Sequence, residues 1–278
     1  SHAGWICSPS PIKLISKINY PNVKYLKFIS TPSTGTSHIS SDIKDDRKIK
    51  IFNLSLSKKI NLIKASSEYT FSLGLSLIKR ISQAEHFVKK GYWRNIEDKL
   101  RTNEVFNKNV GIIGFGRIGK NLYKYSKVFG MKPIVYDPNI KIKNYKSIKN
   151  LEKIKKKAEI IFVCINLTKK NVKFIDKKFF CNLKQKPFFI NTSRGEVIDE
   201  KALIFALKNN LISSAALDVI TNEQKLKLAK NILVKYSLKY PEKLLITPHI
   251  AGLTFESEYK AIDITIELIN ENLKKLNG

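Results

Sequence analysis

The segment Val110–Asp137 reads VGIIGFGRIGKNLYKYSKVFGMKPIVYD and holds a strand, a glycine-rich turn, a helix and a second strand. An apolar run, Val110–Ile113, leads directly into the spacing G-x-G-x-x-G, which opens the helical pattern Ile118–Phe129. The first glycine of this spacing permits a tight turn, the second lets a diphosphate approach the backbone, and the third lets the helix pack on the strand. Free N–H groups at the start of the helix attract phosphate. We therefore predict that a dinucleotide binds at this turn, against Gly114, Gly116, Arg117, Ile118 and Gly119.

Asp137 ends the second strand of this unit and indicates which dinucleotide binds. A carboxylate at this place accepts hydrogen bonds from the ribose hydroxyls of the adenosine and repels the 2′-phosphate of NADP. Pro138 and Asn139 follow, and no arginine stands there to receive such a phosphate. The predicted cofactor is therefore NAD. The alternative is a glycine-rich loop of another α/β protein, which the combination of strand, helix and acidic residue disfavours.

Strand and helix patterns alternate along the rest of the chain. Short apolar runs separated by helices are typical of a parallel sheet covered on both faces. Six such runs occur, at Val110–Ile113, Ile134–Tyr136, Ile160–Ile165, Phe188–Ile190, Ala215–Val219 and Leu244–Ile246. We predict an α/β protein with a Rossmann-type doubly wound parallel sheet in residues 66–251, the NAD-binding domain. A second, smaller flavodoxin-like α/β domain, residues 1–65 and 252–278, is expected to bind the substrate.

The smaller domain carries fewer signals. Two strands are predicted there, at Val23–Ser30 and Ile49–Leu54, and a terminal helix at Asp263–Leu276. A long helical pattern, Ser67–Lys90, begins the predicted NAD-binding domain.

Three reactive side chains follow three later strands of the predicted sheet. Arg194, Glu223 and His249 each come after an apolar run, and the carboxyl ends of parallel strands meet at the edge where ligands bind. Arg194 could fork onto a carboxylate, and His249 could donate a proton to a carbonyl oxygen. Glu223 could fix the tautomer of the imidazole. Each residue alone is more often structural, but together they form an acid, its orienting carboxylate and a substrate clamp.

The composition excludes several classes of protein. The net charge of +28 raises nucleic-acid binding as a possibility, but only six of the 51 basic residues are arginine, and the lysines are scattered. A compositional bias is the simpler interpretation, so no specific nucleic acid is expected. Three cysteines without a Cys-x-x-Cys pair favour a reducing compartment, and we expect a cytoplasmic protein. No apolar run approaches the length of a membrane span, and neither membrane binding nor a metal ion is expected.

Four blocks resemble the D-isomer-specific 2-hydroxyacid dehydrogenase family. They are FISTPSTGTSHI at Phe28–Ile39, the segment Val110–Asp137, INTSRGEVIDEKALIFALKNNLISSAALDVITNE at Ile190–Glu223, and LITPHIAGLTFES at Leu245–Ser257. The resemblance implies that Arg194, Glu223 and His249 are catalytic. It implies that Asp218 binds the nicotinamide carboxamide and that Thr34 and Gly35 bind the substrate carboxylate through backbone N–H groups. Further cofactor contacts are expected from Cys164, Thr192 and Gly252.

The resemblance implies an enzyme that transfers hydride between NAD and C2 of a small D-2-hydroxy acid or 2-keto acid. It also implies a homodimer, with Trp93–Arg94 on the dimerisation arm. Members of the family usually have a longer segment before the long helix, so we expect that the first strand of the substrate domain is missing and activity is weak. The rival hypothesis is a non-catalytic, NAD-sensing protein on the same fold, like the corepressors called C-terminal binding proteins. Nucleic-acid binding without NAD is a third.

Overall fold

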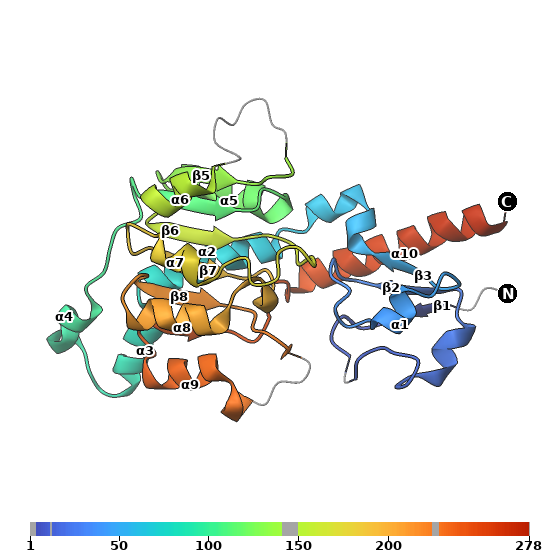
Figure 1. The fold of residues 1–278 in the computed structure, drawn as a ribbon, viewed down its shortest axis with the longest axis horizontal. Helices are drawn as coiled ribbons and strands as arrows, with labels where there is room; N and C mark the ends of the chain where they lie inside the picture. The colour runs from blue at the N-terminus through green and yellow to red at the C-terminus, as the bar shows by residue number, and fades with distance from the viewer. Residues whose placement is uncertain (1–3, 12, 141–149, 224–227, 278) are drawn as a thin grey trace. The chain divides into compact units, whose positions relative to one another are not determined.

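The computed structural model describes residues 4–11, 13–140, 150–223 and 228–277. The chain divides into two compact units. The larger unit is Ser66–Ala251, and the smaller unit combines Ser1–Ala65 with Gly252–Gly278. Figure 1 shows both units with their elements labelled in chain order.

The larger unit is built on a six-stranded sheet in which every pair of neighbouring strands is parallel. The strand order is β5-β4-β6-β7-β8-β9. The chain thus passes from β4 outward to one edge and then crosses back to β6 on the other side of β4. In such sheets ligands bind where the winding reverses. The strands are β4 (Asn109–Ile113), β5 (Lys132–Tyr136), β6 (Ile160–Val163), β7 (Phe188–Asn191), β8 (Ser214–Leu217) and β9 (Leu244–Ile246).

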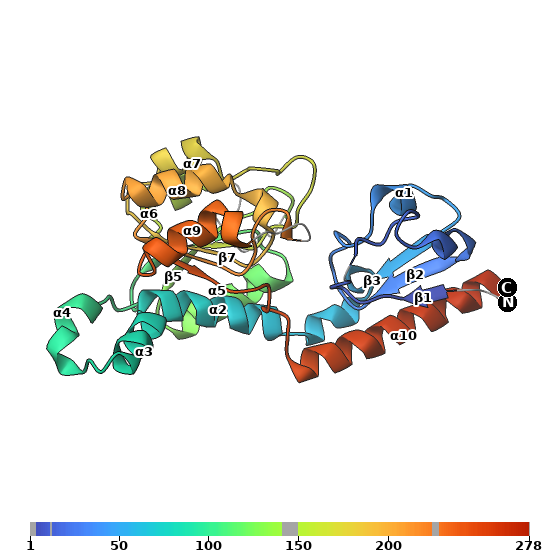
Figure 2. The ribbon, with the colours of Figure 1, turned by 90° about the horizontal axis from the view of Figure 1, so that it is seen from below.

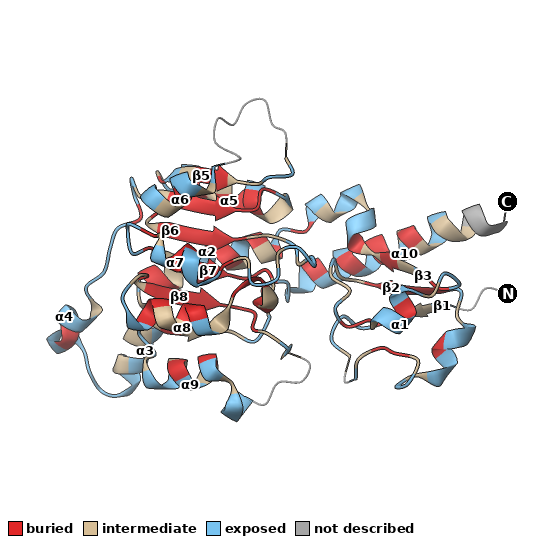
Figure 3. Ribbon diagram, viewed as in Figure 1, coloured by how far each residue is buried: buried red, intermediate tan, exposed pale blue. Residues whose placement is uncertain are grey.

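Helices cover both faces of this sheet, because successive strand residues point to opposite sides. On one face Ile161 and Phe189 join a core with α6, α7, α8 and α9; on the other Phe162 and Ile190 join a core with α2 and α5. Figure 2 shows the two helical layers, and Figure 3 shows the buried strands between them. The helices are α2 (Ala65–Ile78), α5 (Arg117–Val128), α6 (Leu151–Lys157), α7 (Lys177–Cys181), α8 (Glu200–Lys208) and α9 (Ile232–Lys239). The predicted doubly wound α/β architecture is confirmed.

The smaller unit contains a parallel sheet in the order β1-β2-β3. Its strands are β1 (Gly4–Ile6), β2 (Phe28–Thr31) and β3 (Lys50–Asn53), and its helices are α1 (Ser41–Lys44) and α10 (Phe255–Asn277). Helix α10 packs on β2, β3 and the 3-10 turns Leu54–Leu56 and Lys58–Leu62. The core lies around Ile15, Ile29 and Ile39, none of them more than 1% exposed.

Three predictions for the smaller unit need correction. The two-strand prediction missed β1, because a three-residue strand is too short to show a periodic pattern. The strand predicted at Val23–Ser30 begins only at Phe28, since Pro21–Tyr25 forms a 3-10 turn with proline at its start. Helix α10 begins at Phe255 and is therefore two turns longer than predicted.

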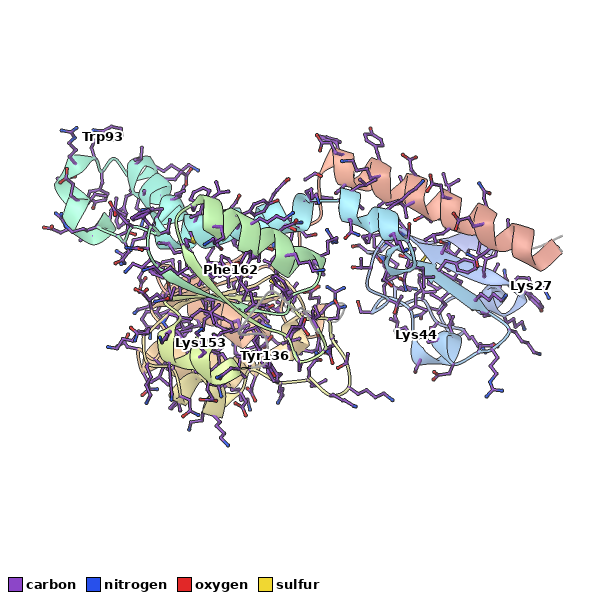
Figure 4. All side chains as sticks on the ribbon, turned by 90° about the horizontal axis from the view of Figure 1, so that it is seen from above. Lys27, Lys44, Trp93, Tyr136, Lys153 and Phe162 are labelled. Atoms are coloured by element: carbon purple, nitrogen blue, oxygen red, sulfur yellow. The ribbon has the colours of Figure 1, made fainter. Side chains whose placement is uncertain are left out.

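The long helix predicted at Ser67–Lys90 is in fact two helices. Helix α2 ends at Ile78, and α3 begins at Ile81 and ends at Lys89. Between them Arg80 has a φ of +53°, the left-handed conformation that interrupts a right-handed helix. Beyond α3 lie the 3-10 turn Arg94–Ile96 and α4 (Glu97–Leu100), and Figure 4 shows Trp93 at the tip of this arm.

Candidate active site

The glycine-rich turn lies at the carboxyl end of β4, where the winding of the sheet reverses. Gly114 has a φ of +98°, and a Cβ there would stand 2.5 Å from the carbonyl oxygen of Cys164 on the neighbouring strand. A Cβ at Gly119 would stand 2.1 Å from the carbonyl oxygen of Gly114, so glycine is required for α5 to pack on the turn. Gly116 is different. A Cβ there would meet no described atom within 4 Å, so the space beside the start of α5 is open.

Asp137 closes one side of this turn from the end of β5. Its carboxylate accepts the N–H of Phe115 at 2.9 Å through Oδ2 and the N–H of Asn139 at 2.9 Å through Oδ1. Each oxygen keeps a further lone pair. The half-buried carboxylate is therefore fixed beside the glycine turn and still able to accept from a ligand hydroxyl.

The other predicted cofactor contacts near this turn are apolar or shielded. Burial raises the pKa of the Cys164 thiol to about 12, so the side chain is a neutral, apolar wall at the end of β6. Arg117 and Ile118 form the first turn of α5, and both are half-buried. Burial lowers the pKa of the Arg117 guanidinium, which nevertheless stays charged at neutral pH.

Arg194 lies on the loop that follows β7. The side chain of Asn191 holds this loop, since its Oδ1 accepts the N–H of Ser193 at 3.0 Å and its amide donates to the carbonyl of Arg194 at 3.0 Å. At Gly195 a Cβ would stand 2.0 Å from the carbonyl carbon of Ile220. The absence of a side chain therefore lets the arginine loop touch the backbone that follows β8. The guanidinium itself donates to the Ser193 carbonyl at 2.6 Å and is half-buried.

Glu223 and His249 form a direct pair. The Nδ1 atom of His249 lies 2.6 Å from Oε2 of Glu223, and Oε1 of Glu223 accepts the N–H of Ile220 at 3.1 Å. A carboxylate only accepts, so Nδ1 carries a proton and Nε2 is the nitrogen left to exchange one. The hydrogen bond that His249 donates to Glu223 raises the pKa of His249, while burial and the positive charge of Arg194 lower it. About half of the His249 side chain is exposed, so it is accessible to a ligand.

Asp218 anchors the turn that carries His249. It is 1% exposed, and its carboxylate accepts the N–H groups of Ile250 at 3.0 Å and Ala251 at 2.8 Å and the hydroxyl of Thr247 at 2.6 Å. His249 itself has a φ of +56°, a conformation that costs free energy for a residue with a side chain. Three hydrogen bonds to one buried carboxylate hold it there. The role predicted for Asp218 toward the nicotinamide stays a prediction; the structure adds this anchoring role.

In the smaller unit, the loop after β2 presents a row of backbone N–H groups. The carbonyl of Ser33 accepts the N–H of Leu54 at 3.0 Å, and the carbonyl of Gly35 accepts the hydroxyl of Ser33 at 2.7 Å. Because a trans peptide is planar, the N–H groups of Thr34 and Thr36 point away from these partners. In the part of the chain that the structure describes, the N–H groups of Thr34, Gly35 and Thr36 have no acceptor. Such a row suits an anion.

Behind this loop lies a buried polar network. Thr31 Oγ1 is 3.1 Å from Ser33 Oγ and 3.0 Å from Nε2 of His38, and His38 in turn is 3.9 Å from the sulfur of Cys7. His38 and Cys7 are 3% and 2% exposed, and burial raises the pKa of the Cys7 thiol. The network fixes Ser33 and thereby the peptide groups beside it. The resemblance named Thr34 and Gly35, whose role toward a substrate stays a prediction, and it named none of these supporting residues.

Two remaining predicted contacts have structural partners of their own. Thr192 is buried, with its hydroxyl 2.6 Å from that of Thr70 on α2. Gly252 is exposed, and its carbonyl accepts from the N–H of Thr254 at 3.1 Å and from the Ser257 hydroxyl at the start of α10. Their contacts to a cofactor stay predictions. Among the described residues, no group of three or more histidine, cysteine, aspartate and glutamate side chains could hold a metal ion.

Comparison with known proteins agrees with this geometry. Residues 71–251 match the family model for the D-isomer specific 2-hydroxyacid dehydrogenase, NAD binding domain. The chain belongs to this family. The match covers the glycine turn after β4, Arg194 after β7, Glu223 after β8 and His249 after β9.

Individual members of the D-2-hydroxyacid dehydrogenase family differ in length and named activity. A D-3-phosphoglycerate dehydrogenase of Methanocaldococcus jannaschii is 30% identical over 254 residues, which are 90% of this chain and 46% of that protein. A glyoxylate reductase of Thermococcus litoralis is 32% identical over 266 residues, 91% of this chain and 74% of that protein. A solved D-lactate dehydrogenase of Aquifex aeolicus, complexed with NAD and lactic acid, superposes with a TM-score of 0.79 at 27% identity. That match covers 94% of this chain and 80% of the other.

The chain thus spans about half the length of some curated relatives and about three quarters of others. Of the helices in the described residues, none combines the length and the apolar character that crossing a bilayer requires.

Proposed function

We propose that this chain is an NAD-dependent oxidoreductase that reduces a small 2-keto acid to the D-2-hydroxy acid and catalyses the reverse reaction. The observation that carries the proposal is the His249–Glu223 pair, 2.6 Å between Nδ1 and Oε2, close enough to Arg194 for its charge to affect the histidine. Together these residues provide a proton donor, its orienting carboxylate and a cation for the substrate.

The glycine turn after β4 would hold the cofactor. The open space beside Gly116 fits a diphosphate against the start of α5, and Asp137 fits the hydroxyls of the adenosine ribose. When bound, the nicotinamide supplies the hydride. Fluorescence titration with NADH and NADPH tests this assignment. NADH should bind more tightly, and Asp137→Ser should narrow the difference; equal affinities in the unaltered protein would contradict the role given to Asp137.

His249 would move the proton. With Nδ1 held by Glu223, Nε2 donates to the carbonyl oxygen of the keto acid and takes the proton back in the reverse direction. Because the bond to Glu223 raises the pKa of His249, the protonated form persists to higher pH than in a free histidine. Reduction should therefore be fast below the pKa of His249 and lose rate above it, and oxidation should show the opposite trend.

Arg194 would hold the substrate carboxylate, and the loop after β2 carries a second group of donors that suits an anion. Arg194 offers a planar fork that matches a carboxylate, and the Thr34–Thr36 segment offers free N–H groups. Arg194 can also polarise the carbonyl that receives the hydride. Both features favour an acid over a simple ketone as the substrate.

The helical arm after α2 supports a homodimer. Helix α3 has no buried residue in the single chain, and its apolar side chains Ile81 and Val88 are at least 50% exposed. Trp93, which follows α3, is 71% exposed. Apolar side chains gathered on such an arm favour a protein partner, and a second copy of the chain is the simplest one (Figure 4). Sedimentation should show a dimer that Val88→Glu weakens; a monomer at all accessible concentrations would contradict this part of the proposal.

A panel of 2-keto acids assayed with NADH tests the activity. Turnover of at least one acid, with a loss of rate as pH rises through the pKa of His249, supports the enzyme. Tight NADH binding without turnover of any acid would favour the rival hypothesis of an NAD-sensing interaction protein instead.

A further inference from the structure

Two adjacent residues of α2, Tyr69 and Thr70, reach the loops that carry the proposed catalytic groups. Neither has a place in the reaction proposed above. The hydroxyl of Thr70 lies 2.6 Å from that of Thr192, and the phenol of Tyr69 lies within reach of the side chain of Thr247. Thr192 precedes Arg194 by two residues, and Thr247 precedes His249 by two residues. One turn of a helix thus contacts both loops at equivalent positions.

The contact at Thr70 has a definite direction. The Thr70 hydroxyl donates to the carbonyl of Ser66 at 2.5 Å within its own helix, which uses its only proton. The hydroxyl of Thr192, 2.6 Å away, must therefore donate to Thr70. Thr70 is fully buried and Thr192 is 8% exposed, so water cannot replace the bond easily. The start of the arginine loop is thereby tied to α2.

The contact at Tyr69 also has a direction. Thr247 donates its hydroxyl proton to Asp218 at 2.6 Å, so its oxygen has only lone pairs left to offer the protonated phenol of Tyr69. Burial raises the pKa of Tyr69, as does the charge of Asp218, and the phenol therefore keeps its proton. The chain Tyr69–Thr247–Asp218 ends at the carboxylate that holds the strained turn of His249.

We propose that Tyr69 and Thr70 are positioning residues that hold the two catalytic loops at a set separation. Thr70 positions Arg194 through Thr192, and Tyr69 positions His249 through Thr247 and Asp218. This inference rests on the proposed function, because it assigns each contact to one half of that reaction: substrate binding to Thr70 and proton transfer to Tyr69.

Substitutions of Thr70 and Tyr69 should mainly affect different kinetic constants, KM for Thr70 and kcat for Tyr69. Thr70→Val removes the acceptor at nearly constant volume and should raise KM for the keto acid about five- to tenfold, with a smaller loss of kcat because Arg194 also polarises the carbonyl. Thr70→Ser keeps the hydroxyl and should restore KM. Tyr69→Phe should lower kcat about five- to tenfold with KM nearly unchanged. The matched control is Ser67→Ala, which removes a buried hydroxyl of the same helix whose partner is the amide of Asn121, away from both loops.

A second measurement does not require turnover. The chain has only four histidines, so the imidazole of His249 can be followed by NMR during a pH titration. Tyr69→Phe should lower the pKa of His249, because a looser turn weakens the bond to Glu223, whereas Thr70→Val and Ser67→Ala should leave it unchanged. Parallel changes of kcat and KM in both variants, or an unchanged titration in Tyr69→Phe, would show that the two residues are merely structural. The unaltered protein could turn over no keto acid while Tyr69→Phe still lowers the pKa of His249. That result would contradict the proposed function and leave the positioning role of Tyr69 supported.

Discussion

Replacement of Gly195 by alanine tests how the arginine loop is held. A Cβ at this position would stand 2.0 Å from the carbonyl carbon of Ile220 and 2.4 Å from the amide nitrogen of Thr221. Non-bonded carbon atoms prefer a separation of about 3.5 Å, so one of the two backbone segments must retreat by roughly 1.5 Å. Arg194 adjoins Gly195, and the other segment leads to Glu223. The substitution therefore separates the carboxylate clamp from the Glu223–His249 pair.

A displacement of about 1 Å among reacting groups costs on the order of 100-fold in rate. We expect kcat/KM of Gly195→Ala for the preferred keto acid to fall by about that factor, while the Kd for NADH stays within about twofold. The control is Gly130→Ala in the turn between α5 and β5, where a Cβ would press on the ring of Phe106 at 2.4 Å, at the end of the strands opposite to the catalytic loops. Steady-state kinetics and thermal unfolding of both variants are compared. If Gly195→Ala loses no more activity than Gly130→Ala, close packing at Gly195 does not position Arg194.

The remaining predictions concern the three proposed catalytic residues. His249→Ala should lower kcat by about 10²- to 10⁴-fold with NADH affinity retained, and turnover above half of the unaltered value would exclude His249 as the proton donor. Arg194→Lys should raise KM for the keto acid strongly, because the charge remains but the fork is lost; unchanged constants would show that Arg194 is not the clamp. Glu223→Gln removes the largest influence that raises the pKa of His249, so the reductive pH profile should begin to fall at lower pH. A profile that keeps its position would mean that Glu223 does not tune His249.

Much of the larger unit could be predicted from the sequence, because its strands are buried on both faces and appear as continuous apolar runs. The glycine turn was recognisable for a physical reason: Gly114 and Gly119 meet backbone atoms at distances that no side chain tolerates. The pairing of His249 with Glu223 followed from their positions after two parallel strands. In these places a local pattern and the topology of the sheet point to the same arrangement.

Other features depend on contacts between distant segments and left no pattern to read. Strand β1 has three residues, and the break at Arg80 comes from one left-handed residue inside an otherwise helical pattern. Tyr69 and Thr70 lie in a helix that is predicted from the spacing of its hydrophobic residues, and this spacing gives no role to either side chain. Their partners, Thr192 and Thr247, are more than 100 residues away in the sequence. A polar residue at a buried helical position, such as Thr70, is the one signal that could have raised the question.

Transfer of deuterium measures the central proposal most directly. The protein is incubated with a 2-keto acid and NADH that carries deuterium on C4 of the nicotinamide, and the product is analysed by mass spectrometry and chiral chromatography. The account predicts a D-2-hydroxy acid with deuterium on C2, formed by the unaltered protein and at a greatly reduced rate by His249→Ala. Binding of the deuterated NADH with no deuterium on C2 of any acid in the panel would contradict it.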